Sequence, residues 1–163
     1  MTKKFLLILI LVLNFANYSF SAGSSDSGGS KLKSNYDKAV SLIKSAKKYD
    51  KKGKSDKAEK RYKKALKLLL KANKKKPSNP NTLNYLGFTS RKLGDFEKGE
   101  NYYLEGLNID PNHIGINEYL GELYVATNRI DLAKERLEIL SSCNCKEYSQ
   151  LKEIIEGTRK SKY

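Results

Sequence analysis

The sequence predicts an all-α fold of three helical hairpins followed by a C-terminal capping helix. Three observations lead to this prediction. A 34-residue period recurs between residues 80 and 145, small residues stand at matched positions of that period, and an amphipathic segment follows it. Hydrophobic residues make up 39% of the 163-residue chain and charged residues 31%, which is typical of a helix-rich protein with a modest core.

The first residues, 1–22, have the layout of a secretory signal peptide. Two lysines in "MTKK" precede the apolar run Phe5–Leu13, and the small polar stretch "NYSFSAG" follows. We expect cleavage after Ser21 or Ala22, and no cysteine stands there to carry a lipid anchor. The alternative is an uncleaved membrane anchor, although the apolar run is short for a bilayer span. Cleavage would release an exported soluble protein, periplasmic in a Gram-negative bacterium.

Residues 23–34 are predicted to be a flexible Gly/Ser linker, followed by the folded domain, 35–163. The first hairpin is expected at about 39–79, with its turn at Gly53 and a second helix about two turns longer than usual. Either Asp56 or Ser55 is expected to cap that second helix. The helix is amphipathic, and one stripe carries its apolar residues: Ala58, Tyr62, Ala65, Leu66, Leu69 and Ala72.

The repeat is clearest when residues 34 positions apart are compared. Gly87 aligns with Gly121, and Gly94 aligns with Asn128. Gly87 and Gly121 are expected to let the two helices of a hairpin approach closely, because a mid-helix glycine otherwise costs about 0.5–1 kcal/mol relative to alanine. Gly94 and Asn128 are expected to end the first helix of each hairpin in the left-handed conformation.

These hairpins resemble tetratricopeptide repeats. The segment 80–113 carries Leu-Gly, then Leu-Gly-Asp-Phe, then a closing Asp-Pro, and 114–145 matches nearly as well. The resemblance implies a right-handed α-solenoid of three tetratricopeptide hairpins. Residues 146–157 are predicted to form the cap helix that covers the last apolar face and to end at Gly157.

The same resemblance implies that the first helices line a concave groove for a peptide or protein segment. The expected groove residues of the second and third repeats are Asn81, Asn84, Phe88, Arg91, Lys92, Glu118, Glu122 and Val125, and those of the first repeat are Ile43, Lys47 and Lys51. The Lys/Asn carboxylate clamp of some family members is not reproduced, because Asn84 and Phe88 occupy those places. Phe88 beside Arg91 could offer a hydrophobic and cationic contact. The alternative for Phe88 is burial between neighbouring repeats.

Cys143 and Cys145 form a C-x-C pair where the last repeat meets the cap helix. Because thiols of exported proteins tend to oxidise, we expect a local disulfide or buried thiols that fix the start of the cap helix. Intermolecular pairing, thiol–disulfide exchange and metal binding are the alternatives. The stretch "SSCNCKEYSQLKEII" also resembles a tail of some exported alphaproteobacterial tetratricopeptide proteins, in which the two cysteines sit further apart.

One end of the repeat array is strongly basic. Residues 31–76 contain 19 Lys/Arg against 4 Asp/Glu, whereas residues 77–163 contain 11 against 13. This charge predicts attraction to an anionic envelope surface or an acidic partner, and the alternative is a solvated helix face. Nucleic acid would suit such a charge in a cytosolic protein, but the expected export argues against it.

No arrangement of residues indicates catalysis. His113 is the only histidine and has no acidic cluster beside it for a zinc site, and neither a P-loop nor a dinucleotide fingerprint occurs. We therefore expect no enzyme, no catalytic residue, no metal and no cofactor. The expected function is a periplasmic adaptor that binds a protein or peptide. The alternatives are an envelope-surface binder acting through its basic first repeat, and a C-x-C thiol-redox protein.

Overall fold

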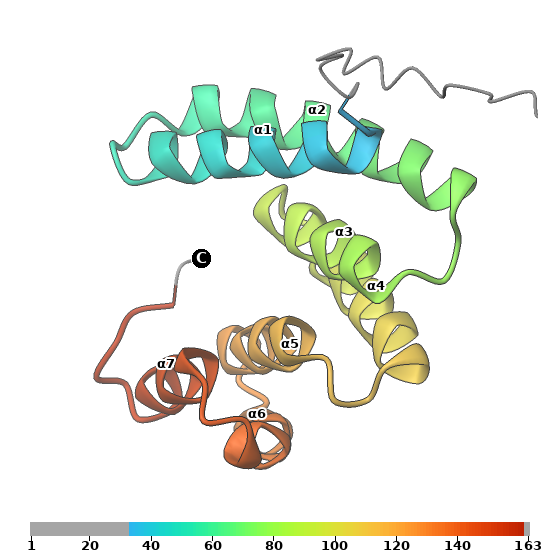
Figure 1. Cartoon of the computed structure of the whole chain (residues 1–163). Coiled ribbons are helices and arrows are strands. Elements are labelled where there is room, and N and C mark those ends of the chain that lie inside the picture. Colours follow the sequence, from blue (N-terminus) through green and yellow to red (C-terminus); the bar gives the residue numbers. More distant parts are fainter. Residues whose placement is uncertain (1–32, 162–163) are drawn as a thin grey trace, which may run out of the picture. The chain divides into compact units, whose positions relative to one another are not determined.

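The computed structural model describes residues 33–161, which form α-helices, one short 3₁₀ helix and no strand (Figure 1). The helices are α1 (Asn35–Asp50), α2 (Ser55–Lys75), α3 (Pro80–Lys92), α4 (Phe96–Ile109), α5 (Ile114–Ala126), α6 (Ile130–Ile139), the 3₁₀ helix η1 (Leu140–Ser142) and α7 (Lys146–Ile155). The expected signal peptide, 1–22, and most of the expected linker lie outside the described residues. Within the described part, no helix is both long enough and apolar enough to cross a membrane.

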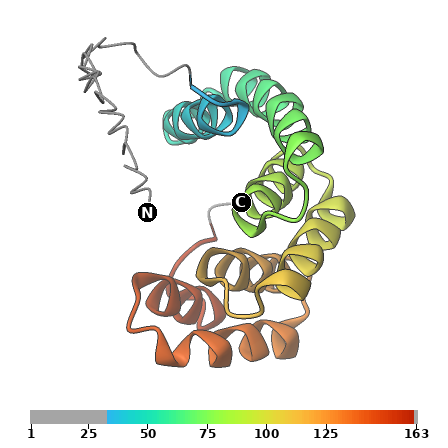
Figure 2. The same cartoon turned by 45° about the vertical axis from the view of Figure 1, so that its right-hand side comes forward.

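Consecutive helices pair as three hairpins, α1–α2, α3–α4 and α5–α6, and α7 contacts α5 and α6 (Figures 1 and 2). The first helices also meet one another, since α3 contacts both α1 and α5. The predicted solenoid of three hairpins and a capping helix is confirmed. Helix α2 has 21 residues against 14 in α4, so the extra length predicted for the first repeat is also confirmed.

The helix ends follow local chemistry in most places. Ser34 forms a capping box with Asp37 at the start of α1, and the Asn79 and Asp95 side chains cap α3 and α4. Gly94 and Asn128 have φ of 89° and 59°, so the left-handed ends predicted for α3 and α5 are confirmed.

The cap predicted for α2 is wrong. Helix α2 begins at Ser55 itself, its N-cap residue is Lys54, and no side chain makes a cap hydrogen bond there. Ser55 and Asp56 therefore lie within the first turn, where the Asp56 carboxylate stabilises α2 through the helix dipole instead.

The two repeat glycines mark the tightest helix contacts. A Cβ added at Gly87 would lie 2.5 Å from the ring of Tyr103 on α4, and one at Gly121 would lie 2.5 Å from a methyl group of Leu151 on α7. The predicted close approach of the two helices of a hairpin is confirmed at Gly87. At Gly121 the three nearest atoms all belong to Leu151 of the capping helix, which also packs on α5.

His113 ties the second and third repeats together. Its Nδ1 accepts the backbone N–H of Ile116 at 3.1 Å and so caps α5. The neutral ring therefore carries its proton on Nε2, which donates to Oδ1 of Asn81 at 3.2 Å. Burial lowers the pKa of His113 from its ordinary value of 6.5, which keeps the ring in this neutral form.

Replacing Gly87 by alanine is expected to lower the free energy of unfolding by about 1–2 kcal/mol, because the cost of overpacking exceeds the gain in helix propensity. The Tyr103 ring is rigid and fully buried, so it cannot yield cheaply. The matched variant is Gly121→Ala, whose new methyl group meets the flexible end of Leu151 and should cost less. Urea unfolding of both variants measures the difference. A Gly87→Ala protein as stable as the parent would contradict this account of the contact.

Acidification should weaken the start of α5. The depressed pKa means that the neutral form of His113 stabilises the fold above about pH 6.5, and that this contribution is lost as the pH falls further. His113→Asn retains a cap acceptor without a titrating group, so at about pH 5.5 it should exceed the parent in stability by about 1 kcal/mol. Thermal unfolding between about pH 7.5 and 5.5 tests this. Parallel pH curves for the two proteins would show that the cap does not depend on His113 protonation.

Candidate functional site

A cavity of about 380 Å³ lies between α1, α2, α3 and the segment after α7. We call it the α1–α3 pocket, and it is lined by Lys47, Asp50, Lys51, Tyr62, Phe88, Lys92 and Ser161. Four of these side chains, Lys47, Lys51, Phe88 and Lys92, belong to the expected groove. The structure therefore brings together groove residues of the first and second repeats.

The floor of the pocket is aromatic. The Phe88 ring lies between Tyr62, at 6.0 Å between ring centroids, and Tyr119 of α5, at 5.2 Å. The ammonium group of Lys47 lies 4.2 Å from the centroid of Phe88 and donates to the Tyr119 hydroxyl at 3.2 Å. In such cation–π contacts the face of an aromatic ring attracts a positively charged group. Two buried aromatic rings therefore lie at the base of the pocket, with positive charge at its edge.

On the opposite side of the pocket, the Asp50 carboxylate holds two other side chains in place. The Tyr62 hydroxyl donates to Oδ2 of Asp50 at 2.7 Å, and Nζ of Lys92 lies 3.0 Å from the same oxygen. Burial, and then the hydrogen bond to Asp50, raise the pKa of Tyr62, so this hydroxyl stays a proton donor at neutral pH. Asp50 thus fixes both the tyrosine and the lysine.

Several other expected groove residues are buried. Phe88 is 1% exposed, and Asn84, Arg91, Glu118 and Glu122 are each 8% exposed or less. Ile43 is also buried, Val125 is half-buried and Asn81 is exposed. The burial of Phe88 is the alternative that the sequence left open. In this conformation Phe88 and Arg91 do not offer an incoming chain an exposed pair of apolar and cationic groups.

Arg91 acts as a buried link between repeats. Its Nη1 donates to the backbone carbonyl of Tyr119 on α5. Gly99 on α4 leaves room for this side chain, since a Cβ there would lie 2.7 Å from Cγ of Arg91. Buried charge requires such partners, so Arg91 contributes to the stacking of α3, α4 and α5.

Sequence reasoning did not identify Asp50, Tyr119 or Ser161 as parts of this region. Tyr62 was expected only on the apolar stripe of α2. The polar end of its side chain could have indicated a hydrogen bond inside the core, because a buried tyrosine hydroxyl usually finds a partner. No sequence signal points to Ser161, which lies about 110 positions from Lys47 and Lys51.

The two cysteines form a disulfide, and Cys145 is the N-cap residue of α7. The bond thus lies where η1 leads into the capping helix. Across residues 33–161, no group of three or more His, Cys, Asp and Glu side chains is arranged to hold a metal ion.

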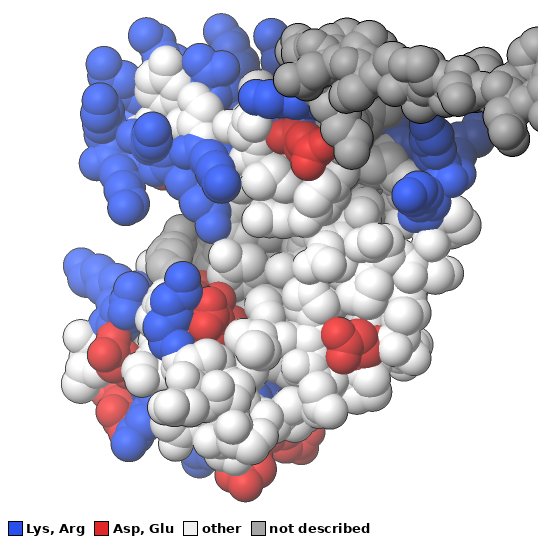
Figure 3. Space-filling model, viewed as in Figure 1, with Lys and Arg blue, Asp and Glu red and all other residues white. Residues whose placement is uncertain are grey.

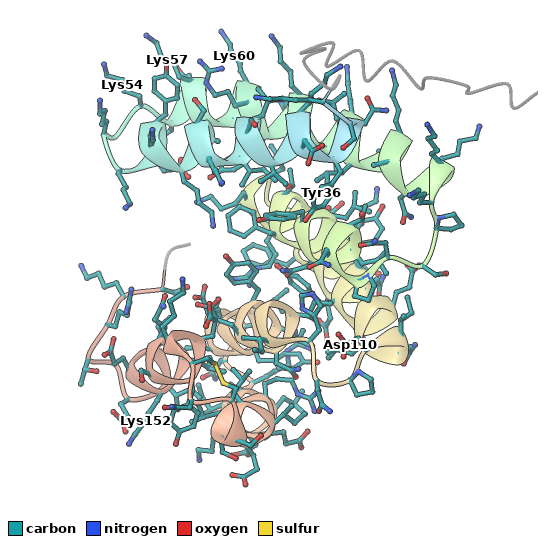
Figure 4. All side chains as sticks on the ribbon, viewed as in Figure 1. Tyr36, Lys54, Lys57, Lys60, Asp110 and Lys152 are labelled. Atoms are coloured by element: carbon teal, nitrogen blue, oxygen red, sulfur yellow. A yellow bond between two sulfur atoms is a disulfide. The ribbon has the colours of Figure 1, made fainter. Side chains whose placement is uncertain are left out.

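The basic first hairpin presents a separate surface. Figure 3 shows Lys and Arg side chains gathered over α1 and α2, with few acidic groups among them. Lys54, Lys57 and Lys60 are exposed, and Figure 4 shows them on the side of α2 that faces away from α3. This surface is distinct from the α1–α3 pocket.

Family models match two parts of the chain. The model of the MIT (microtubule interacting and transport) domain matches residues 36–87, which contain α1, α2 and the first part of α3. The model of the tetratricopeptide repeat matches residues 82–113, which cover nearly all of the α3–α4 hairpin. No curated protein sequence matches.

Solved structures are similar at low sequence identity. The type III secretion translocator chaperone SycD of Yersinia enterocolitica has a TM-score of 0.53 and 14% identity, over 72% of this chain and 81% of that one. The Arabidopsis OM64 tetratricopeptide domain has a TM-score of 0.49 and 15% identity, over 77% and 99%. The first such domain of Spaghetti (RPAP3), bound to the HSP90 peptide SRMEEVD, has a TM-score of 0.48 and 21% identity, over 78% and 97%. The described residues therefore have the fold of a tetratricopeptide repeat domain, and residues 82–113 are similar in sequence to that repeat family.

Proposed function

We propose that this protein is a non-enzymatic adaptor that binds a protein or peptide segment at the α1–α3 pocket. The observation that carries the proposal is the combination of an aromatic floor, Tyr62 and Phe88, with the ammonium groups of Lys47 and Lys92. A few placed polar groups around an apolar surface are typical of binding sites. A segment that carries acidic side chains would meet these ammonium groups above the aromatic floor.

The arrangement supports binding better than chemistry. Lys47 is held over Phe88 and against the Tyr119 hydroxyl, and Asp50 is held by Tyr62 and Lys92. A general base needs to reach a proton of its substrate, whereas this carboxylate is already committed to two donors. We infer a surface that positions a partner.

We further propose that the adaptor is an exported, periplasmic protein of the alphaproteobacterial kind. The support is the charged, apolar and small-residue layout of residues 1–22, together with the cysteine tail that resembles exported tetratricopeptide proteins. A disulfide between Cys143 and Cys145 suits an oxidising compartment.

A second candidate function rests on the basic hairpin. Here the protein would bind an anionic envelope surface through the exposed lysines of α1 and α2. The observation that favours it is the concentration of these lysines on one hairpin, away from the pocket (Figures 3 and 4). Each lysine near an anionic membrane contributes about 1 kcal/mol of attraction, which salt screens.

Cross-linking capture from envelope extract tests the adaptor. Lys51 lines the pocket, whereas its neighbour Lys52 is exposed and does not. We expect Lys51→Glu to weaken binding of the captured partner about tenfold, equivalent to about 1.4 kcal/mol, and Lys52→Glu to leave it nearly unchanged. The isolated partner is then titrated against each variant. Equal loss with both substitutions would remove the pocket as the binding site.

Vesicle co-sedimentation tests the second function. Phosphatidylglycerol vesicles should retain the protein at low salt and release it as the salt rises above about 0.5 M, whereas phosphatidylcholine vesicles should not retain it. Changing Lys54, Lys57 and Lys60 together to glutamate should abolish retention. The matched control changes Lys134, Lys146 and Lys152 to glutamate, which alters the net charge equally but lies on α6 and α7. Equal losses in the two triple variants would show a response to net charge alone.

A further inference from the structure

The Cys143–Cys145 disulfide joins two residues at the start of α7, a helix that apolar contacts already anchor. Leu151 and Ile154 of α7 are 0% and 4% exposed, and the helix contacts α5, α6 and η1. A bridge across a single residue closes a very short loop, and the entropic gain from a disulfide grows with loop length. The bond therefore adds little to the stability of the fold, which leaves a chemical role open to it.

The disulfide lies at the surface of the molecule. Cys143 and Cys145 are partly exposed, and their neighbours Ser142, Asn144 and Lys146 are exposed. Exchange between a thiol and a disulfide requires the attacking thiolate to reach a sulfur atom, so access is its first condition. The surroundings of this bond are open to another molecule.

The N-terminus of α7 offers a thiolate an interaction that a disulfide cannot use. Cys145 is the N-cap residue, and a side chain at this position accepts the N–H of the second or third helical residue, here Glu147 or Tyr148. Its sulfur makes no cap hydrogen bond in the disulfide. A thiolate carries a full negative charge, which such N–H groups and the helix dipole stabilise. Reduction therefore allows a contact that favours the reduced form.

The two sulfur atoms differ in their surroundings. Cys143 ends the 3₁₀ helix η1, where the free backbone groups are carbonyls, and these disfavour a negative charge. Cys145 begins α7, where the free groups are N–H donors. Glu147 is the acidic residue of the first turn of α7 and opposes a thiolate there, but its Oε1 lies 3.8 Å from the ammonium group of Lys146, which offsets its charge. Negative charge is therefore better placed on Cys145 than on Cys143.

We propose that the Cys143–Cys145 disulfide is an exchangeable oxidant for a dithiol, with Cys145 as the sulfur that leaves. A thiolate of the dithiol attacks Sγ of Cys143, the bond between the two cysteines breaks, and its electron pair stays on Sγ of Cys145 as a thiolate. The second thiolate of the dithiol then attacks its own sulfur in the mixed disulfide and releases Sγ of Cys143. Two electrons pass to the cysteines, the dithiol becomes a disulfide, and its two protons pass to the released thiolates or to water. Each chain oxidises one dithiol, and this activity is separate from the α1–α3 pocket.

Peptide mapping of the mixed disulfide tests which sulfur leaves. The probe is reduced glutathione, which is added to the oxidised full chain at neutral pH; the reaction is stopped with acid and free thiols are alkylated. Trypsin releases both cysteines in the peptide of residues 137–146, LEILSSCNCK, and fragmentation in the mass spectrometer locates the glutathione. We expect it on Cys143 about tenfold more often than on Cys145, which corresponds to a typical N-cap interaction. Equal occupancy of the two cysteines, or a disulfide that glutathione leaves fully oxidised, would overturn the proposal.

A matched pair of asparagine variants tests the electrostatic argument. Asn144 and Asn128 have positive φ values, 45° and 59°, and aspartate adopts this conformation as asparagine does. Asn144→Asp places a carboxylate between the two cysteines, so the ratio of dithiol to disulfide in a glutathione buffer should fall about threefold. Asn128→Asp, at the end of α5, should leave that ratio unchanged. The same ratio in both variants would contradict a stabilised thiolate at Cys145. Both experiments use glutathione and the full chain, so neither result depends on the proposed binding function.

Discussion

Close contact between helices at positions without side chains is the constraint on which the rest of this structure depends. Each hairpin has an apolar face that only a neighbouring element can cover. At Gly87 the ring of Tyr103 occupies the space that a Cβ would take, and at Gly121 the methyl groups of Leu151 do the same. A side chain at Gly87 would force the rigid Tyr103 ring or the helices to move, whereas the flexible end of Leu151 can yield in part at Gly121.

The candidate site is a consequence of the same stacking. Because α3 contacts both α1 and α5, side chains from three hairpins meet around the Phe88 ring. Lys47 then finds an aromatic face and a hydroxyl from two other hairpins, and Lys92 finds Asp50. The pocket combines charge with aromatic surface because neighbouring repeats contribute different chemistry to one place.

The groove could be predicted only in part from the sequence. Lys47, Lys51, Phe88 and Lys92 were placed on the inner helices by their repeat positions, and the cavity includes all four. The same reasoning expected Arg91 and Glu122 to face a ligand, and both are buried. A repeat position specifies the helix face, but the depth of a side chain on that face depends on its neighbours. Gly99 leaves room for Arg91 within the same hairpin, but the carbonyl that Arg91 binds belongs to Tyr119 of the next repeat.

The sequence by itself determined the all-α class, the hairpin order, the long α2 and the left-handed helix ends at Gly94 and Asn128. These features depend on spacing and backbone preference within about one repeat, which is the range over which a sequence pattern acts directly. Only the tertiary structure decided that Gly121 contacts the capping helix, that His113 binds Asn81 while it caps α5, and that Ser161 reaches the first hairpin. Such contacts depend on how rigid hairpins stack in space, because residues distant in sequence become neighbours only after the whole array has formed.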